Sequence, residues 1–295
     1  MKKIIVIGSI SIDNVVYTKV LPGPGTTVMG EAFLSNIGGK GANQACAAKF
    51  LGADVFFYGS VGKDDNGKRI KSFLSEQGLS FRLKESEKST GIASITLDMT
   101  TGENRIVIVP GSNMDINKGD VLSLEDEFSK RDIFLTQLEN PVETVLEALK
   151  LAKKHHLLTV LNPAPFHEVP DEIYQYIDYF VPNEHEIDGY VKDTNQSFED
   201  KAKEVLKKGC KNVIITLGEN GSLLVNKKET IKIFSIKVNA VDTTSAGDSY
   251  LGALVTALAE NKNIVEAMQF ATRCSAITVT RKGAIISLPK REEIR

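Results

Sequence analysis

The stretch VDTTSAGDSYLGAL, residues 241–254, joins a run of small and polar residues to an apolar helical pattern. Helical spacing over residues 246–260 is kept by apolar side chains, those of Tyr250, Leu251, Leu254, Val255 and Leu258. Asp248 therefore lies in the first turn of a predicted helix, where backbone N–H groups lack partners and the helix dipole is positive. Because residues 245–247 are small, a phosphate can approach these N–H groups, and the stretch predicts an anion site.

Asp248 has two interpretations at this position. If a substrate hydroxyl reaches it, the carboxylate can accept the hydroxyl proton while the N–H groups hold the charge of a transferring phosphoryl group. Alternatively, Asp248 stabilises the helix as an ordinary first-turn acid, and the small residues before it permit tight packing. Spacing alone leaves both interpretations open.

Length and composition limit the class of protein. With 295 residues, 42% hydrophobic and 25% charged, the chain is long enough for one large α/β domain or two smaller ones. The formal net charge of −2 gives no reason to expect nucleic acid as a partner. No apolar run approaches the roughly 20 residues of a membrane span. Met1-Lys2-Lys3 and the short apolar run after it predict a buried strand rather than a signal peptide.

Cysteine and histidine positions do not indicate a metal site. The three cysteines, Cys46, Cys210 and Cys274, are far apart and odd in number. They indicate neither a disulfide framework nor a metal cluster, and they predict a reducing cytoplasm. His155 and His156 end a predicted helix, where cations complement the helix dipole.

Strand-like runs alternate with amphipathic helices along most of the chain. We predict strands at residues 3–7, 55–58, 133–136, 158–161, 179–181 and 213–216, and helices at 43–51, 67–77 and 141–155, with Pro141 as the first helical residue. Such alternation is typical of a mostly parallel sheet with helices on both faces. The fold class is therefore a three-layer, Rossmann-like α/β fold.

Two segments, about residues 12–35 and 91–109, break this alternation. The second holds two alternating runs around residues 100–104, which is a hairpin pattern. Together the segments predict a small antiparallel sheet that projects from the main one and acts as a lid or pairs with a copy of itself. We therefore expect a single domain over residues 1–295 with a lid inserted in two pieces.

If the chain binds phosphates, it must do so with a feature other than the two common glycine-rich motifs. The chain has neither the G-x-G-x-x-G of dinucleotide-binding folds after its first strand nor a P-loop. Asn183 and Glu186 follow a predicted strand, where the ligand site of an open α/β sheet lies. Glu186 suits Mg²⁺ held through water, which fits a nucleoside triphosphate, although the N-x-x-E spacing also suits a helix capping box.

A glycine-rich run, GGKGANQ at residues 38–44, precedes a predicted helix. Its glycines allow the backbone to approach a ligand, and Lys40 and Asn43 offer donors to hydroxyl groups. Asp13 and Glu139, each just after a predicted strand, add acceptors. A set of Asp, Asn, Lys and Glu suits a polyhydroxylated ligand, because buried polar groups left unpaired reject analogues that lack a hydroxyl. Taken singly, each of these residues is better explained by a surface or capping role.

These segments together resemble the PfkB (ribokinase-like) family of carbohydrate kinases over nearly the whole chain. The resemblance rests on ordered segments: NIGGKGANQA at 36–45, QLENP at 137–141, LNPAP at 161–165, PNEHE at 182–186, ITLGENG at 215–221, VDTTSAGDSYLGAL at 241–254 and TRKGA at 280–284. It implies ATP-dependent phosphorylation of a pentose at its primary hydroxyl, with the 5-hydroxyl of D-ribose as the expected acceptor.

The resemblance also assigns site residues. It makes Asp248 the catalytic base and places the anion hole at Ser245, Ala246 and Gly247. The residues it implies for the sugar are Ser11, Asp13, Gly39, Lys40, Asn43, Ala93, Ile95, Glu139 and Asp248. Those it implies for ATP are Asn183, Thr216, Gly218 and Gly247.

Cofactors and assembly follow from the same resemblance. It implies Mg²⁺ organised by Glu186 through water, and a monovalent cation, usually K⁺, held by Asp242, Thr244, Thr278, Arg281, Gly283 and Ser287. Several of these would act through their carbonyl groups. It further implies a homodimer formed through the lid sheet.

Two residues depart from the family pattern. Ser11 stands where Asn is usual, and its shorter side chain leaves open whether ribose, 2-deoxyribose or another small sugar or nucleoside is the acceptor. Ser245 stands where Gly or Ala is common, and it leaves the backbone amides intact, so we expect activity to be kept. A sugar-binding regulator without activity is disfavoured because Asp248 is present.

Overall fold

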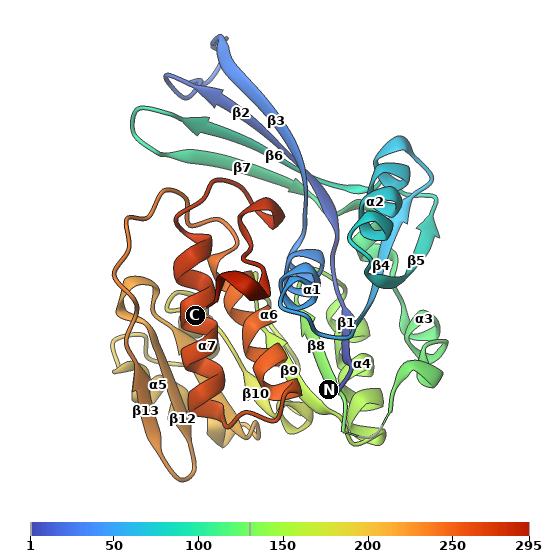
Figure 1. Cartoon of the computed structure of the whole chain (residues 1–295), viewed down its shortest axis with the longest axis vertical. Coiled ribbons are helices and arrows are strands. Elements are labelled where there is room, and N and C mark those ends of the chain that lie inside the picture. The colour runs from blue at the N-terminus through green and yellow to red at the C-terminus, as the bar shows by residue number, and fades with distance from the viewer. Residues whose placement is uncertain (1, 130, 295) are drawn as a thin grey trace.

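The computed structural model describes residues 2–129 and 131–294. A nine-stranded sheet has the order β13-β12-β11-β10-β9-β8-β1-β4-β5, and a four-stranded sheet projects from it (Figure 1). The strands of the main sheet are β1 (Ile4–Ile7), β4 (Val55–Gly62), β5 (Ser80–Ser86), β8 (Ile133–Gln137), β9 (Leu158–Asn162), β10 (Tyr179–Phe180), β11 (Asn212–Thr216), β12 (Ser222–Asn226) and β13 (Thr230–Ile233). Neighbouring strands from β11 to β5 run parallel, and β12 and β13 are added antiparallel.

Helices cover both faces of this sheet, as the continuous apolar runs of its strands require. In β1, Ile4 and Val6 face one hydrophobic core while Ile5 and Ile7 face the other. The first core packs α1 (Lys40–Phe50), α2 (Asp65–Glu76), α6 (Ala246–Ala259) and α7 (Ile264–Thr278). The second packs α3 (Lys118–Leu122), α4 (Val142–Lys154) and α5 (Phe198–Lys207). The predicted three-layer α/β fold is therefore confirmed. No helix in the part of the chain that the structure describes has the length and apolar character needed to cross a membrane.

Some element boundaries differ from the predicted ones. Helix α1 begins at Lys40 rather than at residue 43, so part of the glycine-rich run is helical. Pro141 is the residue before α4 and not its first helical residue. Strand β5, which the sequence did not predict, lies at the sheet edge and reads SFRLKES, and its charged residues hide the strand pattern.

The projecting sheet, which we call the lid sheet, contains β2 (Ser11–Thr18), β3 (Gly30–Gly38), β6 (Gly91–Asp98) and β7 (Asn104–Val109). Strands β6 and β7 form the predicted antiparallel hairpin. The prediction of a wholly antiparallel sheet is wrong, because β2 pairs with β6 in parallel. Strand β2 follows β1 and β6 follows β5 after short links, and β1 and β5 run the same way in the main sheet. The chain therefore enters the lid sheet twice in the same direction.

A glycine contact brings α1 and α6 unusually close. A Cβ atom on Gly252 of α6 would lie 2.5 Å from the Cβ of Ala47 and 2.8 Å from the carbonyl oxygen of Gln44. A Cβ atom on Gly41 would lie 2.6 Å from the carbonyl carbon of Gly8, just after β1. Since no larger residue fits without movement, these glycines set the position of α1 against α6 and the main sheet.

Candidate active site

Asp248 lies in the first turn of α6, as predicted, and its side chain is buried. Both carboxylate oxygens accept hydrogen bonds from side chains of α1. Asn43 Nδ2 donates to Oδ2 at 2.9 Å, and Gln44 Nε2 donates to Oδ1 at 2.9 Å. The carboxylate therefore faces the glycine-rich run rather than the apolar interior.

The three residues predicted to form an anion hole, Ser245, Ala246 and Gly247, lie directly before Asp248 at the start of α6. Ser245 has a left-handed backbone with φ 59°, and its Oγ accepts a hydrogen bond from Asn43 Nδ2 at 3.0 Å. The N–H of Ala246 already donates to the Thr243 carbonyl at 3.2 Å, so that amide is partly engaged. The N–H groups of Gly247 and Asp248 lie in the first turn, where the helix provides no acceptor. A Cβ atom on Gly247 would meet nothing within 4 Å, which leaves open space beside these donors.

Hydrogen bonds hold the Glu139 carboxylate beside the first residue of α1. Ser9 Oγ donates to its Oε2 at 2.5 Å, and the Lys40 N–H donates to the same oxygen at 3.0 Å. Burial alone would lower the pKa of the Lys40 ammonium, but the carboxylates of Asp248, Glu139 and Glu186 raise it above its ordinary value. Lys40 therefore stays charged among acidic groups that come from three different segments.

Asp13 reaches this cluster from β2 of the lid sheet. Burial raises its pKa to about 6, against a hydrogen bond from Ser11 that lowers it, and the charges of Glu139 and Asp248 raise it further. The Ser11 hydroxyl donates to Asp13 Oδ1 at 3.1 Å. Ala93 of β6 pairs opposite Asp13, and Ile95 lies two residues along on the same face. The structure thus brings the predicted lid residues beside the predicted sugar acceptors.

Asn183 and Glu186 form the reciprocal contacts of a capping box. Asn183 Oδ1 accepts from the Glu186 N–H at 2.7 Å, and Glu186 Oε2 accepts from the Asn183 N–H at 2.8 Å. Glu186 is the first residue of a short 3₁₀ helix, Glu186–Tyr190, and Asn183 lies three residues before it. Burial raises the pKa of Glu186, although the Asn183 N–H and the charge of Lys40 oppose that change. Thr216 bridges to Asn183 from the end of β11, and Gly218 follows with φ 53°.

The donor set at Glu186 fits magnesium. Magnesium keeps several waters and is usually bound through one or two carboxylates together with substrate phosphates. Within the described part of the chain, no group of three or more His, Cys, Asp or Glu side chains could hold a metal ion by itself. A single carboxylate beside the open first turn of α6 is therefore the arrangement that this ion would meet.

The residues named for the monovalent cation fall in two linked segments. Asp242 Oδ1 accepts from the Thr244 N–H at 2.9 Å, and its Oδ2 accepts from the Gly283 N–H at 2.9 Å. Thr278 and Ser287 are fully buried, and Ser287 Oγ donates to the Ala284 carbonyl at 2.7 Å. Arg281 forms an ion pair with Glu293. Asp242, Thr244 and Gly283 are thus brought together, while the Ser287 and Arg281 side chains engage other partners.

Three buried amide side chains near Asp248 were missed by the sequence interpretation. They are Gln44, Gln137 and Asn162, and Gln44 contacts both of the others. Gln137 and Asn162 end strands β8 and β9, and a polar residue at the end of an apolar strand is a signal that could have found them.

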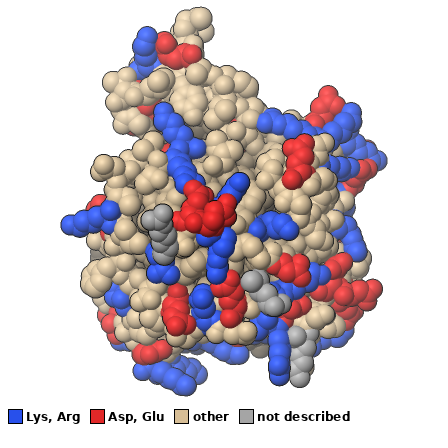
Figure 2. All heavy atoms as spheres, viewed as in Figure 1, with Lys and Arg blue, Asp and Glu red and all other residues tan. Residues whose placement is uncertain are grey.

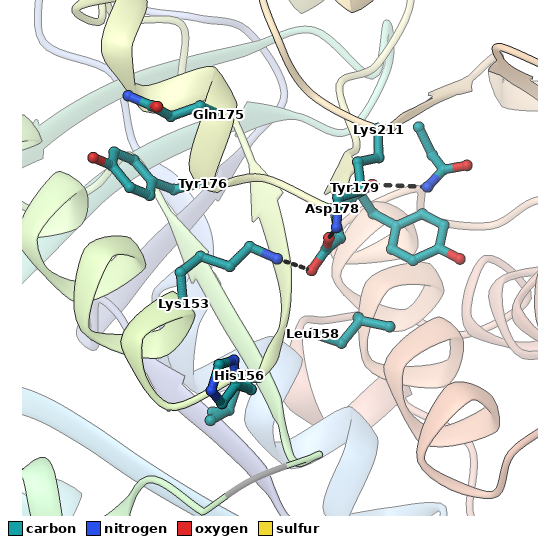
Figure 3. Close-up of a pocket in the computed structure, with 10 residues that line it drawn as sticks. Lys153, His156, Leu158, Gln175, Tyr176, Asp178, Tyr179 and Lys211 are labelled. Carbon is teal, nitrogen blue, oxygen red and sulfur yellow. Dashed lines mark hydrogen bonds and ion pairs between the residues drawn. The ribbon is translucent and has the colours of Figure 1, made fainter.

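A pocket lies at the amino-terminal ends of β9, β10 and β11, and Figure 3 shows the side chains that line it. Asp178 in its wall accepts hydrogen bonds from Lys153 and from Lys211, the latter at 2.8 Å. Burial would raise the pKa of Asp178, but these two lysines hold it below its ordinary value. The pocket contains none of the predicted site residues, and both of its lysines pair with its one carboxylate, Asp178.

The fold and the site define a carbohydrate kinase, with a carboxylate at an open helix N-terminus beside acceptors suited to hydroxyl groups. The model of the pfkB family of carbohydrate kinases matches residues 1–291, and the chain belongs to this family. It is therefore an enzyme that transfers a phosphoryl group from ATP to a carbohydrate.

Relatives and solved structures agree with this family. The chain is 37% identical over 303 residues to the ribokinase of Staphylococcus aureus, covering 99% of this chain and 98% of that protein. It is 34% identical over 296 residues to the deoxyribokinase of Salmonella typhimurium, covering 98% and 96%. The structure of Arabidopsis thaliana ribokinase complexed with ribose and ATP matches with a TM-score of 0.89 and 30% identity, covering 99% and 97% of the two chains.

Proposed function

We propose that the chain phosphorylates the 5-hydroxyl of D-ribose with ATP, giving ribose 5-phosphate and ADP. The observation that carries this proposal is the position of Asp248, fixed by α1 at the first turn of α6. In the reaction the sugar oxygen attacks the γ-phosphorus in line while Asp248 accepts the hydroxyl proton. The N–H groups at residues 245–248 hold the charge that develops on the transferring group.

The sugar site is built from both acceptors and donors. Asp13 and Glu139 accept from sugar hydroxyls, and Lys40 donates. Asn43 Oδ1 is buried and has no hydrogen-bond partner within residues 2–129 and 131–294. A buried acceptor of this kind needs a donor, and a sugar hydroxyl supplies one. Gly39 lets the backbone approach the ligand, with φ 92°, and Ala93 and Ile95 give apolar contact from the lid sheet.

ATP lies, in this proposal, between the first turn of α6 and the ends of β10 and β11. Asn183, Thr216, Gly218 and Gly247 contact the nucleotide, and Glu186 holds Mg²⁺ through water. Magnesium would neutralise charge on the phosphates. Asp242, Thr244, Thr278, Arg281, Gly283 and Ser287 surround the monovalent cation, largely through carbonyl oxygens. The hydrogen bonds of Asp242 to Thr244 and Gly283 support this part of the proposal.

The lid sheet is proposed to close over the sugar, in a chain that forms one domain over residues 1–295. Asp13 comes from this sheet, whereas Lys40 and Glu139 come from the main body. Closure therefore completes the ligand set and excludes water from the reacting groups.

We also propose a homodimer through the lid sheet. Strand pairing places Val15, Ile95, Ile106 and Leu34 on the face that carries Asp13. Ile106 is 51% exposed, and in Figure 2 the sheet surface at the top of the molecule is mostly uncharged. An exposed apolar sheet face of this kind favours burial against a second copy.

A reducing cytoplasm is the proposed compartment. Cys46, Cys210 and Cys274 are all free and buried. Burial raises the pKa of each thiol to about 12, so none is poised for oxidation.

A second candidate acceptor is 2-deoxyribose. The Ser11 hydroxyl donates to Asp13. Because it is engaged there, the contact that a longer side chain would make to a sugar hydroxyl is lost. Without that contact, selection against a sugar lacking the hydroxyl weakens.

A substrate panel tests the proposal. ADP release is measured with ribose, 2-deoxyribose, other pentoses, fructose and common nucleosides, and the acceptors are ranked by kcat/KM. We expect ribose to rank first. A nucleoside or a hexose at the top would overturn the pentose assignment, and absence of ADP release with every acceptor would favour a regulator without activity.

A further inference from the structure

We propose that Gln44 is a positioning residue for the base: its side-chain amide holds Asp248 in the orientation that accepts a proton, and Gln137 supports the direction in which that amide faces. The inference rests on the proposed function, in which Asp248 is the base.

Consecutive residues of α1 grip the two oxygens of one carboxylate. Asn43 binds Oδ2 and Gln44 binds Oδ1, each at 2.9 Å, so the carboxylate cannot rotate without breaking a hydrogen bond.

The Gln44 amide is fully used within the protein. Its Nε2 donates to Asn162 Oδ1 at 3.0 Å as well as to Asp248, and its Oε1 accepts from Gln137 Nε2 at 2.7 Å. If the Gln44 amide were reversed, its Oε1 would face the oxygens of Asp248 and Asn162. Its NH₂ group would then face the NH₂ group of Gln137. Asp248, which can only accept, and the Asn162 oxygen therefore set the direction in which Gln44 donates, and the contact with Gln137 supports that direction.

The hydrogen-bond partners of Gln44 and Asn43 separate their roles. Gln44 is 0% exposed and Gln137 is 1% exposed, so neither reaches the substrate. Asn43 keeps a buried Oδ1 free for a sugar hydroxyl, as described above, and thus serves both binding and the base. Gln44 acts only through Asp248, and its loss is expected to change kcat rather than KM.

The main test is the Gln44→Met variant, which keeps length and removes both donor and acceptor. We expect kcat to fall about 10- to 100-fold with the KM values for sugar and ATP nearly unchanged, as misplacement of a reacting group produces. A wild-type kcat in the folded variant, or a fall in kcat matched by an equal change in the KM values, would overturn the inference.

A second variant tests the amide direction without changing Gln44. In Gln137→Glu the new carboxylate accepts but cannot donate, so it attracts Gln44 Nε2 and turns Oε1 toward Asp248. We expect a loss of kcat at least as large as that of Gln137→Met, which only removes the constraint. If both variants turn over at the same rate as the wild type, the relay through Gln137 is wrong.

Thr144→Val is the matched control. Thr144 is buried in α4, where its Oγ1 donates to the Ile116 carbonyl at 2.8 Å, away from the site. This variant loses a buried hydrogen bond, so stability should fall while kcat and the KM values stay as in the wild type. A lowered kcat in the folded control would show that any loss of a buried hydrogen bond lowers it, and the inference would fall. If Asp248→Asn keeps full turnover, the proposed function fails together with the inference. If the Gln44 and Gln137 variants keep full turnover but Asp248→Asn does not, only the inference fails and the assignment of Asp248 as the base stands.

Discussion

Ser11 donates its hydroxyl proton to Asp13 across 3.1 Å, within one strand of the lid sheet. One of the two residues that depart from the family pattern is thus held against a residue proposed to bind the sugar. Sugar selection is therefore the first property in which this chain should differ from its relatives.

Ser11→Asn should restore a longer polar side chain beside the sugar. We expect the ratio of kcat/KM for ribose to that for 2-deoxyribose to rise about 3- to 10-fold, the worth of one neutral hydrogen bond. Both sugars are assayed by ADP release. Ser94→Asn, at an exposed position on the opposite face of the lid sheet, is the control. An unchanged ratio in the Ser11 variant would remove this residue from sugar selection.

Asp248→Asn removes proton acceptance and keeps the size of the side chain. We expect kcat to fall about 10³-fold or more, while sugar and ATP binding measured by calorimetry change little. Asp65→Asn, an exposed first-turn acid of α2, should leave turnover unchanged. Near-normal turnover in the Asp248 variant would reject it as the base.

Asp13 should make stability depend on pH. Its pKa of about 6 in the folded chain lies above the ordinary value of 3.8, so the folded state binds the proton more tightly than the unfolded state does. The contribution of Asp13 to the stability of the fold is fully present below about pH 4 and is lost as the pH rises through 6. Asp13→Asn should therefore gain about 1–3 kcal/mol of unfolding free energy relative to the wild type between pH 4 and 7.

Denaturant unfolding at several pH values measures that difference. Asp98→Asn provides a contrast, because hydrogen bonds from the N–H groups of Thr100 and Thr101 lower the pKa of Asp98. A lowered pKa gives stability above the unfolded value, so this variant should lose stability at neutral pH. A stability difference for Asp13→Asn that does not change with pH would contradict the raised pKa.

Monovalent cations should affect turnover through the linked segments at Asp242 and Gly283. Potassium exchanged for a bulky organic cation should lower kcat, and Asp242→Ala should remove most of the difference between cations because the segments lose their connection. Initial rates at constant ionic strength provide the measurement. Equal rates in potassium, sodium and an organic cation would exclude the site.

Dimer formation should depend on one face of β7. Ile106→Glu puts a charge on the face that carries Asp13, whereas Val107→Glu puts the same charge on the other face of the same strand. Both positions are exposed, at 51% and 65%. Light scattering should show a monomer for the first variant and a dimer for the second, and the reverse result would assign the interface to the opposite face.

Buried strands and amphipathic helices were predictable from this sequence because burial on both faces leaves continuous apolar runs. Runs such as Ile4–Ile7 contain no competing pattern. Strand β5 was not predictable in the same way, since an edge strand carries charges that resemble a loop. The parallel pairing of β2 with β6 depends on where each chain segment leaves the main sheet, which local sequence does not encode.

The candidate site was predictable where residues stand next to glycines or at helix starts, as Asp248 and Lys40 do. Gln137 and Asn162 lie within QLENP and LNPAP, yet only tertiary packing brings them to Gln44. Asn183 and Glu186 illustrate the reverse difficulty, because their spacing encodes a capping box that the structure forms whether or not a metal binds. The roles proposed for these residues stay predictions until the variants are measured.

The close contact between α1 and α6 has a consequence for how this enzyme can change over evolutionary time. Gly252 stands one turn after Asp248 on the same helix, and its missing side chain leaves room for the backbone of Gln44 itself. Any bulkier residue there would push the two helices apart and move the base away from its donors. A substitution that fills the interior to raise thermal stability is therefore not available at this position. Selection for a durable fold and selection for rapid chemistry act there on the same few atoms.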